Sequence, residues 1–254
     1  MPLLDRPAVW YADHRDPTVH RLPVVMLHGA GGSHLDWPAE LRRLPEANAI
    51  ALDLPGHGRS PGPGRSTVSA YAADVVAVLD ALKLPQAIIM GYSLGGGIAQ
   101  VVAAQYKKRV AGLILLATSA RLTVNPTLLD GLQNDYDATL QKLIDWQWAD
   151  PAGEQIKRLS LRRLQEMDRA VLRSDYQAAN QFDGRDRLAQ IEAPTLIIGG
   201  TADRMTPVAE SDYLHEHITG SKLVKITGGG HLMALEQPLV VASAVQEWLL
   251  EQYP

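Results

Sequence analysis

Cysteine is absent from all 254 residues of the sequence. Its absence excludes disulfide bonds, cysteine-ligated zinc, iron–sulfur clusters and a thiol nucleophile. Phenylalanine is nearly absent as well, with one residue against eight tyrosines and five tryptophans, so we expect a mainly aliphatic core. A chain of this length buries roughly 75% of the surface that it exposes when unfolded, so the core needs no metal or disulfide for stability.

An excess of positive charge is also missing. The 24 lysine and arginine residues are outnumbered by 28 aspartate and glutamate residues, which disfavours a nucleic-acid-binding protein with a basic stripe. No run approaches the roughly 18 apolar residues of a membrane-spanning helix. Residues 1–16 contain early acidic side chains and no long apolar segment, unlike a secretory signal. We therefore expect a cytoplasmic protein, a monomer or a small homo-oligomer, that binds neither nucleic acid nor membranes.

Short aliphatic runs recur along the chain, separated by turn residues and helical patterns. Apolar runs of about four to six residues are typical of strands buried on both faces of a parallel sheet. The runs are PVVML at 23–27, AIAL at 49–52, AIIM at 87–90, GLILL at 112–116, TLII at 195–198 and KLVKI at 222–226. A weaker run near 8–11 predicts an antiparallel edge strand.

Helical patterns alternate with these runs. Residues 69–82 carry apolar side chains at spacings of three and four, with Thr67 as the expected N-cap. Further helices are expected over 94–107, 208–219 and 238–250. Strands that alternate with helices through short links predict an open, mostly parallel α/β sheet flanked by helices.

One segment, residues 120–190, contains no convincing buried strand and is rich in leucine, arginine, glutamine and aspartate. It is much longer than an ordinary connection between two strands. We therefore predict a helical cap over 120–190, inserted into an α/β core made of residues 1–119 and 191–254.

A G-x-S-x-G sequence, Gly91 to Gly95, lies directly after the AIIM run and directly before a helix. A sharp strand-to-helix reversal exposes the central serine above the sheet edge, and flanking glycines remove side chains that would clash. The helix N-terminus also favours the negative charge that develops there. This context predicts that Ser93 is a nucleophile rather than a simple helix cap.

A serine nucleophile needs a base, and the base needs an orienting acid. In this type of fold the acid and then the histidine follow the serine along the chain. His231 follows three glycines just past the last aliphatic run, whereas His215 and His217 lie in a predicted surface helix and are weak evidence for a metal site. We therefore expect His231 to be the general base.

The acid is expected at the end of another strand. Asp203 follows the TLII run within turn-like residues, at the sheet edge where catalytic groups gather in open α/β folds. An aspartate there can also be an ordinary turn or helix cap. The rivals Asp130, Asp135 and Asp137 lie in the predicted cap and follow no aliphatic run. Asp203 is thus the predicted third member of the triad.

Acyl transfer also needs donors for the oxyanion of the tetrahedral intermediate. The backbone N–H of Leu94, the residue after the nucleophile, is one expected donor. The second is assigned to the N–H of Ala30, in the glycine-rich loop after the PVVML run. His28 precedes that loop, and we expect it to brace the loop rather than act as a base.

With these motifs the sequence resembles the α/β-hydrolase fold superfamily over nearly its whole length. The motifs occur in the order typical of that family: HGAGG at 28–32, LPGHGRS at 54–60, GYSLG at 91–95, GTAD at 200–203 and GGGH at 228–231. The resemblance implies a serine hydrolase with the triad Ser93, Asp203 and His231, an oxyanion hole at Ala30 and Leu94, and no cofactor or metal. Small capped carboxylesterases and lactonases, such as enol-lactone hydrolases and pimeloyl-carrier-protein methyl esterases, are most similar.

At several positions this sequence differs from other enzymes of the superfamily, and these differences disfavour their activities. Haloalkane dehalogenases and epoxide hydrolases of this superfamily have aspartate where this chain has Ser93. A menaquinone-pathway synthase of this fold shares GYS-x-GG but has arginine at the position of Gly97, although Arg121 lies in a similar place early in the cap. Ala30 stands where the methyl esterases often have a bulky aromatic residue, which leaves more room beside the acyl group.

Substrate selection is expected in the cap. Trp146, Trp148, Tyr136 and Leu143 form a possible wall above Ser93, with Arg121 beside it; the alternative is that these side chains only pack the cap. Six basic residues between 157 and 173 predict a solvated helix face, or else a surface for an acidic acyl group or a carrier protein.

The sequence thus predicts hydrolysis of a small-molecule carboxylic ester, lactone or thioester through an acyl-enzyme. Two other classes stay open at this point. One is a cofactor-free perhydrolase or carbon–carbon bond hydrolase with the same triad. The other is a non-catalytic ligand receptor on the same fold, because fold alone does not determine function. Labelling by a fluorophosphonate distinguishes the receptor from the enzymes.

Overall fold

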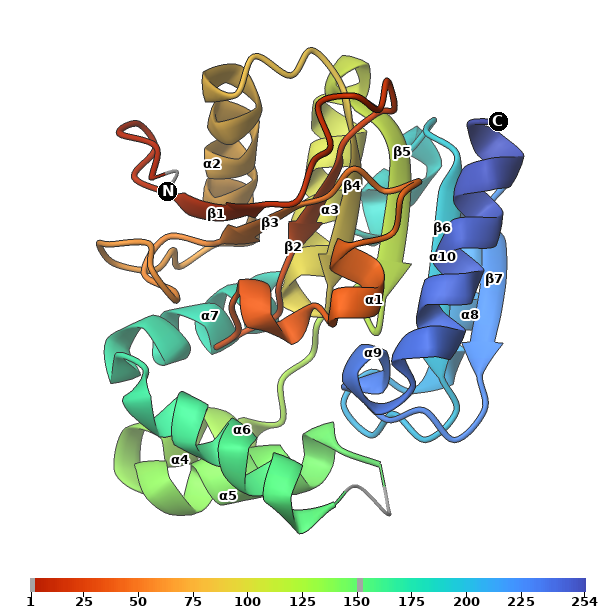
Figure 1. The fold of residues 1–254 in the computed structure, drawn as a ribbon. Helices are drawn as coiled ribbons and strands as arrows, with labels where there is room; N and C mark the ends of the chain where they lie inside the picture. Colours follow the sequence, from red (N-terminus) through yellow and green to blue (C-terminus); the bar gives the residue numbers. More distant parts are fainter. Residues whose placement is uncertain (1–2, 150–152) are drawn as a thin grey trace.

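The computed structural model describes residues 3–149 and 153–254. Its strands are β1 (Trp10–Asp13), β2 (Val24–Leu27), β3 (Ile50–Asp53), β4 (Ala87–Tyr92), β5 (Val110–Leu116), β6 (Thr195–Gly200) and β7 (Lys222–Ile226). They form one seven-stranded sheet in the order β1-β3-β2-β4-β5-β6-β7 (Figure 1). β1 pairs with β3 in the antiparallel sense, and all other neighbours are parallel. The predicted mostly parallel α/β sheet is therefore confirmed.

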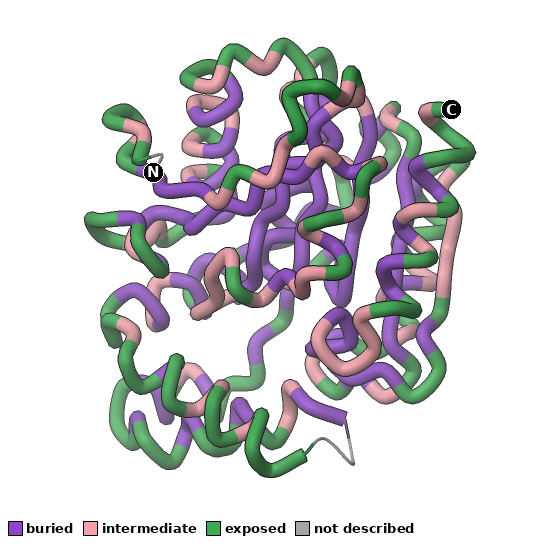
Figure 2. Tube along the Cα trace, in the orientation of Figure 1, coloured by how far each residue is buried: buried purple, intermediate pink, exposed green. Residues whose placement is uncertain are grey.

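Each aliphatic run of the sequence overlaps one of these strands. The residues of β2, β3, β4 and β6 are all buried, which Figure 2 shows as a continuous purple centre. Edge strand β1 begins at Trp10, two residues later than the weak run near 8–11. Valine, leucine and isoleucine dominate the core, as the scarcity of phenylalanine predicts.

Helices cover both faces of the sheet. On one face α1 (Ala39–Arg42) contacts α10 (Pro238–Gln252), and on the other α2 (Val68–Ala81) contacts α3 (Leu94–Gln105). The other short elements are α8 (Val208–His217), α9 (Met233–Glu236) and the 3-10 helices η1 (His34–Asp36), η2 (Lys107–Arg109) and η3 (Arg185–Gln190). Helix α8 packs on β6 and β7.

Four helices lie between β5 and β6 along the chain: α4 (Pro126–Asn134), α5 (Tyr136–Gln147), α6 (Glu154–Glu166) and α7 (Arg169–Gln181). In Figure 1 helices α4, α5 and α6 form a separate layer beyond the carboxyl ends of the strands, and α7 lies between that layer and the sheet. Helices α4 to α7 are together called the cap below. The 3-10 helix η3, within the segment predicted as cap, contacts α3 and α8 of the sheet-covering layers. The division of the chain at residues 120 and 190 stays a prediction.

The length and apolar character of each helix show whether it could cross a membrane. Within residues 3–149 and 153–254, no helix is both long enough and apolar enough to cross a membrane.

Helix α2 begins with a side-chain cap, which gives a direct test of local stability. The Thr67 hydroxyl accepts a hydrogen bond from the amide of Ala70 at 3.2 Å. Replacing such a cap by alanine typically costs about 1 kcal/mol, because an amide at the helix start loses its partner. We expect Thr67→Ala to lower the free energy of unfolding in urea by about that amount, and Thr67→Ser to preserve it. Equal stability of wild type and Thr67→Ala would contradict this role.

Candidate active site

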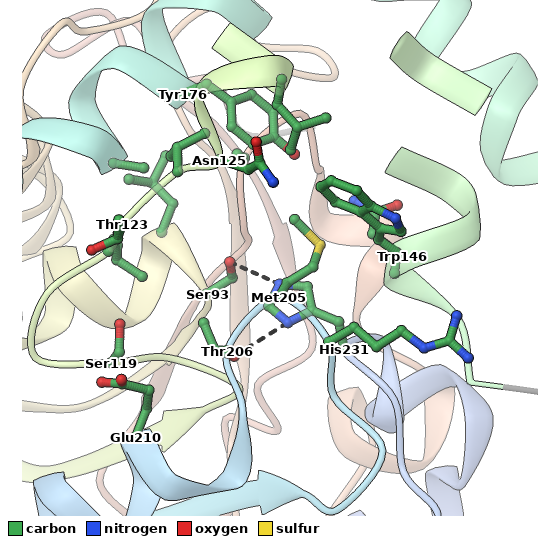
Figure 3. A pocket seen from close by; sticks show the side chains of 18 of the residues that line it. Ser93, Ser119, Thr123, Asn125, Trp146, Tyr176, Met205, Thr206, Glu210 and His231 are labelled. Carbon is green, nitrogen blue, oxygen red and sulfur yellow. Dashed lines mark hydrogen bonds between the residues drawn. The ribbon is translucent and has the colours of Figure 1, made fainter. Parts of the chain in front are cut away.

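Ser93 occupies the reversal between β4 and α3. Its backbone has φ 53° and ψ −117°, a conformation that costs a non-glycine residue about 1–3 kcal/mol. A side chain at Gly91 would collide with the carbonyl of Gly95, and one at Gly95 would collide with the carbonyl of Leu27 in β2. The two glycines therefore permit the reversal, and Ser93 reaches the cavity beneath the cap (Figure 3).

The structure brings the three predicted triad residues together in one chain of hydrogen bonds. His231 Nε2 lies 3.0 Å from Ser93 Oγ (Figure 3), and His231 Nδ1 lies 2.9 Å from Oδ2 and 3.1 Å from Oδ1 of Asp203. Asp203 follows β6 and His231 follows β7, so adjacent strands bring both residues to the sheet edge where Ser93 lies. Both side chains are buried, with 6% of Asp203 and 2% of His231 exposed.

The carboxylate of Asp203 is supported by a turn that follows it. Oδ1 accepts hydrogen bonds from the amides of Met205 at 2.8 Å and Thr206 at 2.9 Å, and Oδ2 accepts one from the Thr206 hydroxyl at 2.8 Å. Burial alone would raise the pKa of Asp203, but the adjacent His231 and the Thr206 donors hold that pKa below its usual value. A charged carboxylate keeps Nδ1 of His231 as a donor and leaves Nε2 to accept from Ser93.

The loop that carries His231 is fastened to the cap, a link that the sequence does not reveal. The Glu236 carboxylate accepts a hydrogen bond from the amide of Gly230 at 2.6 Å and another from the amide of Ala149, just after α5, at 2.8 Å. The amide of Leu232 donates to the carbonyl of Gln147 at 3.0 Å. The position of the histidine is thus tied to the end of α5.

The two predicted oxyanion donors both border the cavity. Among the residues that the structure describes, neither the amide of Leu94 nor that of Ala30 donates a hydrogen bond to a protein acceptor, so both are available to a ligand. Leu94 is the first residue of α3, where amides lack a partner inside the helix.

His28 braces the Ala30 loop as expected. Its Nδ1 donates to the carbonyl of Gly29 at 2.8 Å, and its Nε2 accepts from the amide of Leu54 at 3.0 Å. A ring that donates at one nitrogen and accepts at the other must be neutral. Burial, together with the charge of His57, lowers the pKa of His28 to about 4, in agreement with this pattern.

A second histidine nearby is in the opposite state. His57 Nδ1 donates to the carbonyl of Pro55 at 3.1 Å, and its Nε2 donates to Oδ2 of Asp175 at 2.7 Å. Burial alone would lower the pKa of His57, but the charge and hydrogen bond of Asp175 raise it above the usual value. The rings of His28 and His57 lie 4.7 Å apart between centroids, one neutral and one favouring the imidazolium. No local pattern in the sequence indicates this pair, because Asp175 is 118 residues from His57.

Ser93 and His231 border a cavity of about 550 Å³ between the sheet edge and the cap. Its apolar lining comes mainly from Leu122, Val124, Leu128, Trp146, Ala179 and Met205. Figure 3 shows Trp146 and Met205 on one side of Ser93, and Ser119 with Glu210 on another. The cavity therefore combines an apolar region under the cap with a polar region beside α8.

The expected cap wall is only partly correct. Trp146 and Arg121 border the cavity, but Tyr136, Leu143 and Trp148 do not. These three side chains are buried within the packed cap, and the ring of Tyr136 lies under the guanidinium of Arg169. Side chains two positions apart on a helix face different directions, so Trp146 and Trp148 at the end of α5 do not share a surface.

The rival residues lie away from the triad. Asp130, Asp135 and Asp137 are exposed on cap helices α4 and α5 or between them, and His215 and His217 are exposed on α8. Within the described part of the chain, no group of three or more histidine, aspartate and glutamate side chains is arranged to hold a metal ion.

The pair His57–Asp175 makes the free energy of unfolding decrease as the pH rises above about 6.5. The charged or titratable groups that face His57 are Asp175 of α7, Asp53 at the end of β3, His28 and Tyr71 of α2. Because the pKa of His57 is raised on folding, its contribution is complete below about pH 6.5 and is lost as the pH rises through the raised value. We expect the unfolding free energy from urea titrations to fall by at most about 1.4 kcal/mol per pH unit in that window. His57→Gln, which does not titrate, should show a shallower fall, and parallel pH curves would refute the assignment.

Comparison with known proteins shows which family this chain belongs to. The model of the alpha/beta hydrolase fold matches residues 23–238. A pimeloyl-acyl-carrier-protein methyl ester esterase of Neisseria meningitidis is 30% identical over 241 residues, which cover 89% of this chain and 93% of that protein. 3-Oxoadipate enol-lactonase 2 of Acinetobacter baylyi is 28% identical over 235 residues, covering 88% of this chain and 87% of that protein.

A solved structure agrees in fold over almost the entire chain. The enol-lactonase of Burkholderia xenovorans LB400 superposes with a TM-score of 0.88 at 21% identity and covers 95% of this chain and 96% of that one. The sheet of seven mostly parallel strands and the family match over residues 23–238 point to the same fold. The chain belongs to the α/β-hydrolase fold family.

Proposed function

We propose that this protein hydrolyses carboxylic esters, lactones included, through an acyl-enzyme on Ser93. The observation that carries the proposal is the unbroken chain of hydrogen bonds from Ser93 Oγ through His231 to Asp203 at the wall of a cavity. A nucleophile, a base and an acid that orients the base are the groups that acyl transfer requires.

In the first half of the reaction, His231 Nε2 takes the proton of Ser93 as Oγ attacks the carbonyl carbon of the ester. The carbonyl oxygen becomes an oxyanion, which accepts hydrogen bonds from the amides of Ala30 and Leu94. The tetrahedral intermediate collapses with cleavage of the bond to the alcohol oxygen, and His231 returns the proton to that oxygen. Asp203 stabilises the imidazolium throughout.

In the second half, water replaces the alcohol. His231 takes one proton of the water as its oxygen attacks the acyl carbon, and the same two amides hold the second oxyanion. Collapse of this intermediate breaks the bond to Ser93 Oγ, which recovers a proton from His231. The products are a carboxylic acid and the free enzyme; a lactone instead yields one hydroxy acid.

The cavity favours compact substrates of moderate size. Its volume of about 550 Å³ and its lining by leucine, valine and methionine suit an aliphatic acyl group. The names of two relatives, a pimeloyl-acyl-carrier-protein methyl ester esterase and a 3-oxoadipate enol-lactonase, refer to a carboxylic ester and a lactone. The small side chain of Ala30 at the cavity wall leaves space beside the acyl carbon.

The menaquinone-pathway synthase, which has arginine at the position of Gly97, fits this chain poorly. A Cβ atom at Gly97 would lie 3.1 Å from Cδ1 of Leu122 and 3.3 Å from ring atoms of Phe182. Leu122 and Phe182 would have to shift by a few tenths of an ångström to admit a side chain at that position, so the packing around α3 favours glycine.

Ser93→Ala tests the nucleophile. If the triad acts as a unit, we expect hydrolysis of p-nitrophenyl butanoate to fall by about 10⁶-fold in kcat, and Asp203→Asn to fall by about 10⁴-fold because the imidazole adopts the wrong tautomer. A fluorophosphonate should label wild type but not Ser93→Ala. Ser69→Ala, an exposed serine on α2, serves as the control and should match wild type. Retained hydrolysis by Ser93→Ala would exclude the mechanism.

Trp146→Ala tests the acyl pocket. Removal of the indole enlarges the apolar region, so we expect the ratio of kcat/KM for octanoate over butanoate esters to rise roughly tenfold, the effect of burying one or two more methylenes. The control is Trp148→Phe, because Trp148 does not border the cavity and its Nε1 has no hydrogen-bond partner among the described residues. An equal ratio in wild type and Trp146→Ala would place the acyl chain elsewhere.

A further inference from the structure

We infer that Asp175 is a positioning residue for the oxyanion hole, through which a cap helix holds the turn that carries the Ala30 amide. This role rests on the proposed function, since it concerns the same oxyanion. Asp175 lies on α7, and none of its surface is exposed. Its carboxylate is hydrogen-bonded to Gly31, His57 and Tyr71 and not to Ser93 or His231, so it acts through other residues.

Three donors from three different segments meet the Asp175 carboxylate. Oδ2 accepts from the amide of Gly31 at 2.8 Å and from Nε2 of His57 at 2.7 Å, and Oδ1 accepts from the hydroxyl of Tyr71 at 2.6 Å. Gly31 follows β2, His57 follows β3 and Tyr71 belongs to α2. A single cap side chain thus joins two loops at the sheet edge and a helix of the core.

The direction of the Ala30 N–H follows from the planar peptide groups on both sides of Ala30. The carbonyl of Gly29 and the N–H of Ala30 belong to one planar trans unit and point in opposite directions. That carbonyl accepts from His28 Nδ1 at 2.8 Å and from the amide of Gly32 at 3.1 Å, which leaves the Ala30 N–H on the opposite side. The next peptide unit ends in the Gly31 amide, which Asp175 holds.

Each of the two units therefore has its own anchor. His28 fixes the first unit from the core, and Asp175 fixes the second from the cap. Gly31 has φ +68°, so the turn depends on a residue with wide conformational freedom, and the Asp175 bond restricts it. Side-chain atoms of Leu172 on α7 and Leu164 on α6 lie against Gly31, so this turn packs directly beneath the cap.

The anchor requires an acceptor oxygen at position 175, and the charge of His57 favours a carboxylate there. An isolated carboxylate with no exposed surface would be strongly disfavoured, because a buried charge needs a partner and hydrogen bonds. The imidazolium of His57, donating from both nitrogens, provides the partner. An amide acceptor at position 175 retains an oxygen for Gly31 and His57, whereas an apolar side chain leaves both donors without an acceptor.

Three substitutions separate positioning from general stability. Asp175→Ala removes the contact to Gly31, and we expect kcat for p-nitrophenyl butanoate to fall about 10- to 100-fold with little change in KM, because small displacements of a catalytic group cost rate rather than binding. Asp175→Asn should restore most of the lost kcat. Tyr71→Phe removes only the donor to Oδ1 and should leave kcat within about threefold while it lowers the melting temperature.

A transition-state mimic provides the readout that a purely structural role would not move. A trifluoromethyl ketone adds to Ser93 Oγ, the serine proton passes to His231, and the resulting alkoxide occupies the oxyanion hole. We expect its inhibition constant to rise in Asp175→Ala by the same factor as kcat falls, and to be unchanged in Tyr71→Phe. Unchanged kcat and inhibitor affinity in folded Asp175→Ala would overturn the inference.

Amide hydrogen exchange tests the same anchor without turnover. In wild type we expect slow exchange at Gly31, and in Asp175→Ala faster exchange at Gly31 and a shifted Ala30 resonance. Absence of ester hydrolysis by wild type would count against the proposed function alone, since exchange still reports on the turn. Identical exchange and resonances in wild type and Asp175→Ala would overturn the positioning role whatever the activity.

Discussion

The reversal of the chain at Ser93 is the constraint on which the rest of the site depends. It demands a positive φ at a serine and permits no side chain at Gly91 or Gly95. The absence of those side chains lets the start of α3 lie against the end of β2, where the carbonyl of Leu27 would otherwise meet a methyl group. That contact brings the loop after β2, and with it the amide of Ala30, beside the serine. The geometry of one turn thus determines the distance between Ser93 and the amide of Ala30, the predicted oxyanion donor.

Three carboxylates, each with several hydrogen-bond donors, position the remaining parts. Asp203 has a turn of donors in addition to His231, and Glu236 joins the loop of that histidine to the end of α5. Asp175 does the same for the loops on the other side of the site. The cap is therefore joined to the catalytic edge by two carboxylates, one near the base and one near the oxyanion turn.

Much of this could be predicted from sequence because the signals are local. Aliphatic runs identify the strands, and a serine between glycines at a strand end identifies the reversal. The order of Asp203 and His231 after two further strands places them at the same edge. The cap could not be predicted so well, since the inward or outward direction of Tyr136, Leu143 and Trp148 depends on how α5 packs against α4 and α6. The partnership of His57 with Asp175 depends on the same docking, and neither residue's neighbours in sequence indicate it.

The pKa of His28, about 4, gives the oxyanion turn a property of its own. Imidazole bases work around neutrality, and at those pH values His28 has already lost its second proton. Its remaining proton stays on Nδ1, toward the Gly29 carbonyl, because the Leu54 amide occupies the other nitrogen. His28, which supports the turn, therefore stays neutral at all pH values near neutrality. A bell-shaped pH–rate profile therefore contains no contribution from His28 on its neutral and alkaline side.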